Sequence, residues 1–215
     1  MPTIVCYGDS NTWGAVPMEG RILPQRFPAG QRWPGVLRDK LGAGYTVIEE
    51  GMNGRTTCLD DPIEGPHKNG LKFLPVVLET HAPLDLLIVK LGTNDLKYRL
   101  SMTADDIADG AGLLIDAAKN SACPPFGKPP AVLLISPAPL ARLTWLAGMF
   151  EGATEKSQRL AIEMARVAKD RDVAFLDAGT IVESSPVDGI HLDAEGQRKL
   201  GLAVADMVTA ILPAA

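Results

Sequence analysis

Five short apolar runs recur along this chain of 215 residues, and they limit what it can fold into. Most of them are continuous runs of valine, isoleucine and leucine, which is typical of strands that are covered on both faces. Helical patterns lie between them. Because parallel strands need a crossover between them, this alternation predicts a parallel sheet in an α/β sandwich. The expected strands are Thr3–Tyr7, Tyr45–Glu49, Leu84–Leu91, Ala131–Ser136 and Val173–Leu176.

Three of the intervening helices have readable ends. The segment Thr103–Asp106 resembles a capping box and precedes an apolar stripe. A second helix is expected from about Glu151 to Arg171, and the last begins near Asp193. The segments Pro17–Gly35 and Cys123–Pro130 are rich in proline and glycine and are expected to be loops. The apolar residues expected to face inward in the second helix are Leu160, Met164 and Val167.

Charge and composition exclude several classes of partner. The net charge of -5 and the lack of a basic run argue against a nucleic-acid partner. No apolar run reaches the roughly 20 residues of a membrane span, and the N-terminus does not resemble a secretory signal. The three cysteines form no C-x-x-C pair, which favours a reducing cytoplasm. We therefore expect one cytoplasmic domain over residues 1–215, without a membrane partner.

Polar residues gather where the expected strands end. In a parallel sheet the loops after the strands emerge at one edge, so these residues should lie close together. They supply a hydroxyl, a glycine-rich turn, a carboxamide and an Asp/His pair, which together suit acyl transfer. The segments are Gly8–Thr12, Glu50–Thr57, Gly92–Asp95 and Val187–Leu192.

The Asp/His pair predicts an oriented base. Asp188 and His191 are three residues apart, so in a turn the carboxylate can accept from Nδ1–H and leave Nε2 to take a proton from Ser10. Ser10 is expected at the N-terminus of a short helix, where the helix dipole favours developing negative charge. The Asn94 carboxamide and the Gly54 N–H are candidate donors to an oxyanion.

Each of these segments also has a purely structural interpretation. The Asp188/His191 turn can simply cap the last helix, the stretch around Ser10 can be a turn with a cap, and Asn94 can form an Asx turn. His81 is expected at the C-terminus of a helix and His67 in a loop.

Other chemistries have little support in the sequence. A metal site would combine His67 or His191 with acidic neighbours, but the spacings match no metal motif, so we expect no metal. The motifs G-x-S-x-G, G-x-G-x-x-G and G-x-x-x-x-G-K-[ST] are absent, and no cofactor is expected. The acidic neighbours considered are Asp60, Asp61 and Asp193.

Four segments in order resemble the sequence blocks of the SGNH (GDSL-type) hydrolases: GDSNT at 8–12, Gly54, GTND at 92–95 and DGIH at 188–191. The resemblance implies a flavodoxin-like three-layer α/β/α sandwich around a five-stranded parallel sheet. It implies that Ser10 is the nucleophile of a catalytic triad completed by Asp188 and His191. It also implies an oxyanion hole formed by the Ser10 amide, Gly54 and Asn94.

Longer stretches, such as "EEGMNGRTTCLDDP" and "HAPLDLLIVKLGTND", are similar to the bacterial arylesterase and acyltransferase subgroup. That subgroup includes oligomeric enzymes that move acetyl groups to alcohols or to peroxide. The resemblance implies a homo-oligomeric serine esterase for short acyl or aryl esters, with acyltransferase or perhydrolase activity. The alternatives are a carbohydrate acetyl esterase, a thioesterase and a catalytically silent binding module.

Some residues near the motifs are candidates for substrate contact. The resemblance makes Trp13 and the segment Trp145–Phe150 candidates for a hydrophobic wall or a subunit contact, and ordinary core packing is the alternative. Trp145, Leu146 and Phe150 are also expected to be apolar surface. Asn11 stands where relatives often carry an aliphatic residue, and Lys90 interrupts a buried strand, where an ammonium needs pairing or neutralisation. The remaining candidates for substrate contact are Asn11, Asn53 and Thr93.

Overall fold

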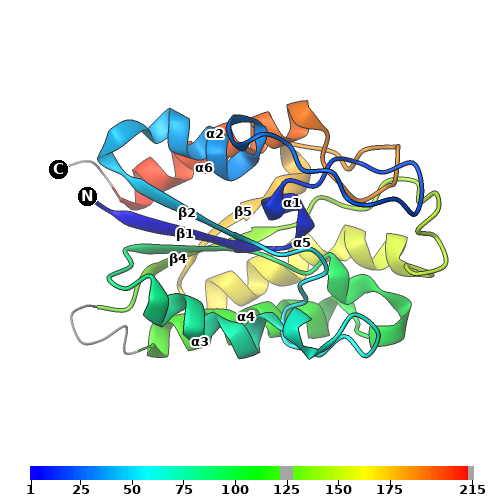
Figure 1. Cartoon of the computed structure of the whole chain (residues 1–215). Coiled ribbons are helices and arrows are strands. Elements are labelled where there is room, and N and C mark those ends of the chain that lie inside the picture. The colour runs from blue at the N-terminus through cyan, green and yellow to red at the C-terminus, as the bar shows by residue number, and fades with distance from the viewer. Residues whose placement is uncertain (122–127, 213–215) are drawn as a thin grey trace.

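A computed structural model describes residues 1–121 and 128–212, and its five strands form one parallel sheet in the order β2-β1-β3-β4-β5 (Figure 1). All five expected strands are present, with ends shifted by no more than a few residues. Cys123 and most of the loop expected at Cys123–Pro130 lie outside the described residues. The strands are β1 (Thr3–Gly8), β2 (Thr46–Gly51), β3 (Leu86–Lys90), β4 (Ala131–Ser136) and β5 (Ala174–Asp177).

Helices cover both faces of the sheet, which confirms the α/β/α sandwich. Figure 1 shows α2 and α6 on one face and α3, α4 and α5 on the other. No helix within the described ranges is long and apolar enough to cross a bilayer. The helices are α1 (Ser10–Trp13), α2 (Trp33–Leu41), α3 (Gly70–Thr80), α4 (Ala104–Asn120), α5 (Ala153–Asp170) and α6 (Ala194–Ile211).

Two apolar cores account for the continuous hydrophobic runs. In β1, Ile4 and Cys6 belong to the core under α2 and α6, whereas Val5 and Tyr7 belong to the core under α3, α4 and α5. Successive side chains of a strand point to opposite faces, so a strand with two covered faces cannot alternate between apolar and polar.

The helix boundaries follow local chemistry. Thr103 and Asp106 form the expected capping box of α4. The expectation of a loop up to Gly35 is wrong for its last three residues, because α2 begins at Trp33. Pro34 is tolerated in the first turn, where backbone N–H groups have no acceptor within the helix.

The order of the strands locates the functional edge. The chain moves outward in one direction from β1 to β2 and in the other from β3 to β5, so the connections diverge between β1 and β3. Gly51 lets α1 pack closely there, since a Cβ at this position would lie 2.1 Å from the Trp13 nitrogen. The N-terminus and the end of α6 lie at the opposite edge of the sheet (Figure 1).

Candidate active site

Ser10 occupies the first position of α1, and only Asp9 separates it from the end of β1. Asp9 caps this helix, because its Oδ1 accepts from the Asn11 N–H at 2.9 Å. Ser10 is largely buried but lines a cavity at the carboxyl edge of the sheet. As the first residue of a helix, Ser10 has an N–H without an acceptor one turn earlier.

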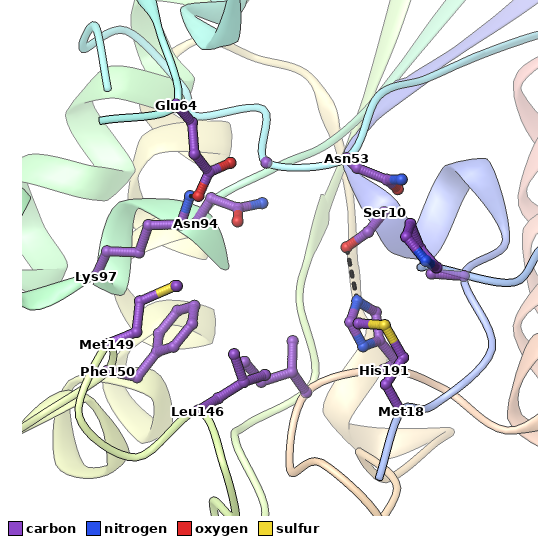
Figure 2. Close-up of a pocket in the computed structure, with 14 residues that line it drawn as sticks. Ser10, Met18, Asn53, Glu64, Asn94, Lys97, Leu146, Met149, Phe150 and His191 are labelled. Atoms are coloured by element: carbon purple, nitrogen blue, oxygen red, sulfur yellow. Dashed lines mark hydrogen bonds and ion pairs between the residues drawn. The ribbon is translucent and has the colours of Figure 1, made fainter. Parts of the chain in front are cut away.

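Ser10, His191 and Asp188 form a continuous chain of hydrogen bonds. His191 Nε2 lies 3.0 Å from Ser10 Oγ, as Figure 2 shows, and His191 Nδ1 lies 2.7 Å from Asp188 Oδ2. Gly189 has a φ of 85°, which lets the chain turn sharply between Asp188 and His191. Ser10 follows β1, and His191 lies in the connection between β5 and α6. The hydrogen bond between them joins these two segments at the carboxyl edge of the sheet.

Asp188 is held as a carboxylate. Burial opposes its ionisation, but hydrogen bonds from His191 and Met18 outweigh burial and lower the pKa of Asp188 to about 2. Its Oδ1 accepts from the Ile190 and His191 N–H groups at 3.0 and 2.9 Å. Its Oδ2 accepts from the Met18 N–H at 2.8 Å. With Asp188 as acceptor at Nδ1, the neutral His191 ring has Nε2 free to accept a proton.

Asn94 and Gly54 lie in neighbouring loops and line the same cavity as Ser10. Figure 2 shows Asn94 and Ser10 in this lining. Asn94 Nδ2 donates to the Arg55 carbonyl at 3.1 Å, and the amide has a second N–H available. Gly54 has a φ of 81°, a left-handed conformation suited to glycine.

Arg55 and Asp95 fix the loops around these donors, and no sequence pattern indicates either role. The Arg55 guanidinium donates to the carbonyls of Gly8 (3.0 Å) and Glu50. Asp95, next to Asn94, accepts from the Thr57 N–H (2.9 Å) and hydroxyl (2.6 Å). Burial raises the pKa of Asp95 to about 6. The two loops are therefore bonded to each other and to the end of β1.

The cavity beside Ser10 has a volume of about 170 Å³ and two unlike walls. One wall is apolar, and Leu146 and Phe150 belong to it with exposed fractions of 6% and 3%. The expectation that these two side chains are apolar surface is therefore wrong, because they pack inward in the core under α3, α4 and α5. The other apolar members are Ala15, Met18, Pro24, Met149 and Ile190, and the polar wall consists of Asn53, Gly54, Glu64, Asn94 and Lys97.

Asn11 does not line the cavity. Its Nδ2 donates to the Ile190 carbonyl at 3.3 Å, and its Oδ1 accepts from the Leu192 N–H at 2.9 Å. These two bonds tie α1 to the segment that carries His191. The side chain of Asn11 therefore fixes the spacing between Ser10 and His191.

Three other candidates for substrate contact also lie outside the cavity lining. Trp13 packs against Arg26, whose guanidinium carbon lies 4.9 Å from the ring centroid. Trp145 Nε1 donates to the Met18 carbonyl at 2.7 Å. Thr93 is buried beside Asn94. Of the six residues considered for substrate contact, Asn53 and Phe150 are the ones that line the cavity.

Lys90 is buried at the end of β3. Burial lowers the pKa of its ammonium, and the nearby Asp9 carboxylate raises it in partial compensation. His81 caps the C-terminus of α3 as expected, and its Nε2 lies 2.8 Å from Glu50 Oε1. The described residues contain no cluster of three or more His, Cys, Asp or Glu side chains that is suited to a metal ion.

Comparison with known proteins identifies a family and several similar structures. The model of the GDSL-like lipase/acylhydrolase family matches residues 6–199. An inhibitor-bound aryl esterase from M. smegmatis is 42% identical with a TM-score of 0.96, covering 99% of this chain and 100% of that chain. The carbohydrate acetylesterase Est24 from Sinorhizobium meliloti is 41% identical with a TM-score of 0.95, with the same coverage. Comparison with curated proteins finds no match. The chain belongs to the GDSL-like lipase/acylhydrolase family and is a carboxylic ester hydrolase.

Proposed function

We propose that this protein is a serine esterase that hydrolyses short-chain acyl esters through a covalent acyl-enzyme. The observation that carries the proposal is the hydrogen-bonded chain from Asp188 through His191 to Ser10, which opens onto a cavity. In our proposal Ser10 is the nucleophile, His191 the general base and Asp188 the group that orients and stabilises the imidazolium.

In the first half of the reaction, Ser10 Oγ attacks the ester carbonyl while His191 Nε2 takes the hydroxyl proton. The Ser10 and Gly54 N–H groups and the Asn94 carboxamide stabilise the tetrahedral oxyanion. The bond to the leaving alcohol then breaks as the alcohol oxygen receives the proton from His191. This leaves the acyl group on Ser10.

In the second half, water attacks the acyl-enzyme as His191 takes its proton, and the carboxylic acid leaves as Ser10 regains a proton. Another alcohol or peroxide in place of water gives acyl transfer by the same steps. The dimensions of the cavity favour small acyl groups, because about 170 Å³ is below the usual range for drug-sized ligands. The apolar wall suits the acyl or aryl carbons.

The replacement Ser10→Ala tests the proposal directly. Hydrolysis of p-nitrophenyl acetate should fall by about 10⁴-fold or more, because the residual site lacks its nucleophile. Intact mass after treatment with a fluorophosphonate should show one adduct on the unmodified chain and none on the variant. Equal turnover by the two proteins would refute the role of Ser10, and a folded chain that takes no label would favour a binding module.

A series from acetate to octanoate, with and without a primary alcohol, measures acyl length and the ratio of transfer to hydrolysis. A preference for acetate and formation of the new ester are the expected results. Self-association, which the resemblance implies, stays a prediction, and light scattering after gel filtration measures it.

A further inference from the structure

The polar wall of the cavity contains a carboxylate that the proposed catalytic steps do not use. Glu64 lies in the connection between β2 and α3 and lines the cavity (Figure 2). Its carboxylate lies next to Gly54. Its Oε1 accepts from Lys97 Nζ at 2.6 Å and from Arg99 at 2.8 Å. Asp61 accepts from the same two cations, from Lys97 at 3.0 Å and from Arg99 at 2.6 Å. We call Asp61, Glu64, Lys97 and Arg99 the charged cluster.

The second oxygen of this carboxylate is open to the cavity. Glu64 Oε2 has no hydrogen-bond or ion-pair partner among the described residues. Its side chain is 32% exposed, whereas that of Lys97 behind it is 2% exposed. A Cβ at residue 54 would lie 2.2 Å from Oε2, so the glycine at this position provides the space that the oxygen occupies.

Oε2 is a carboxylate oxygen and accepts hydrogen bonds, and the cations of the charged cluster balance its charge. No net charge is therefore left beside the oxyanion. The two carboxylates of the cluster are balanced by one ammonium and one guanidinium. An unbalanced anion here would oppose the negative charge that develops on the carbonyl oxygen. The compensated carboxylate can still accept a hydrogen bond, and bonds to ionised groups are stronger than neutral ones.

An ester group cannot satisfy this acceptor. A carbonyl and an ether oxygen both accept hydrogen bonds and have no proton to donate. Asn53, another residue of the polar wall, has an Oδ1 that is buried and without a hydrogen-bond partner in the described structure. A substrate that forms a hydrogen bond with Oε2 must therefore carry a donor outside its ester group.

We propose that Glu64 Oε2 forms a subsite for a substrate hydroxyl, so that the enzyme prefers esters with a free hydroxyl close to the ester group. This inference rests on the esterase function proposed above. The charged cluster has no net charge, so it offers an acceptor without a net negative field. It therefore favours a hydroxyl over an ammonium. The subsite sets specificity and takes no part in the proton transfers at Ser10.

Two probes that differ in one donor test this proposal: 2-hydroxyethyl acetate and 2-methoxyethyl acetate. The unmodified enzyme should favour the hydroxy ester about 10-fold in kcat/KM, because one hydrogen bond to a charged group is lost with the methoxy ester. In Glu64→Gln this ratio should fall to about one. The glutamine should keep its carbonyl oxygen toward Lys97 and Arg99, because an NH₂ group there would face two cations. Its NH₂ group then takes the place of Oε2 and presents a donor, not an acceptor, to the cavity.

Glu195→Gln on α6 is the matched control, because Glu195 pairs with Arg198 outside this cavity and its loss should leave the ratio unchanged. A ratio near one in the unmodified enzyme overturns the subsite while the esterase function stands. An equal fall of both rates in Glu64→Gln, with the ratio kept, also overturns it and makes Glu64 purely structural. Failure to hydrolyse either probe or p-nitrophenyl acetate overturns the esterase function and the subsite with it.

Discussion

Asn94 has two tasks that belong to different N–H bonds of the same amide. One N–H holds the Arg55 carbonyl, and thereby the loop that carries Gly54. In our proposal the other donates to the oxyanion. In this proposal a single side chain connects the rigidity of the site with the stabilisation of its transition state.

Removal of this amide gives a sharp prediction. Asn94→Ala should lower kcat on p-nitrophenyl acetate by about 10²–10³-fold, as expected for an oxyanion donor, with a smaller change in KM. Steady-state kinetics measures the effect, and thermal melting shows whether the variant is folded. An unchanged kcat in a folded variant would exclude Asn94 from the oxyanion hole.

Sequence separation explains which site residues could be predicted. Asp188 and His191 are three residues apart in a tight turn, so their contact can be inferred from local geometry alone. Glu64 and Lys97 are 33 residues apart, and their contact depends on the packing of two loops after different strands. No local pattern reports such a contact, which is why the charged cluster became visible only in the structure.

Among the elements, the connection between α1 and α2 closes one side of the site. Met18 lies in this connection and bonds in two directions: its N–H donates to Asp188, and its carbonyl accepts from Trp145 Nε1. Its side chain also lines the cavity. The connection therefore links Asp188, the apolar wall and Trp145 through one residue.

Trp145→Phe tests this link, because it keeps an aromatic ring and removes the N–H. The free energy of unfolding should fall by about 1 kcal/mol, the usual net value of one hydrogen bond. kcat/KM should fall by roughly 5-fold as Met18 loses one of its two anchors. Urea unfolding and steady-state kinetics measure the two effects. An unchanged kcat/KM would show that Trp145 has no part in positioning Met18.

The elements differed in how easily the sequence revealed them. The strands were predictable because two covered faces leave unbroken apolar runs, and α4 because its capping box is a local motif. The start of α2 was hidden by Pro34 and Gly35, which usually interrupt helices. A Cβ on Gly35 would lie 1.7 Å from the Ala29 carbonyl oxygen, so its glycine serves packing and not a turn.

For the whole molecule, buried carboxylates predict how stability depends on pH. The pKa values of Asp188 and Asp61 are lower in the folded chain than their ordinary values, so the unfolded chain binds more protons in acid. Their stabilisation is present above about pH 4 and is lost as the pH falls toward 2.

Urea unfolding between pH 2 and 6 measures this loss. Asp188→Asn should remove a part of the acid dependence worth about 2 kcal/mol, because the amide cannot take up the proton that the carboxylate binds. The same slope in the variant and the unmodified chain would show that Asp188 does not contribute to it.

The positions of the chain ends have a practical consequence. The N-terminus and the end of α6 lie at one edge of the sheet, and α1 lies toward the other (Figure 1). Because α1 begins with Ser10, the cavity that Ser10 lines lies on that far side. A tether attached at the N-terminus would hold the protein on a solid support with the mouth of the site turned toward the solution. A fused carrier domain should likewise leave the approach of small esters unobstructed.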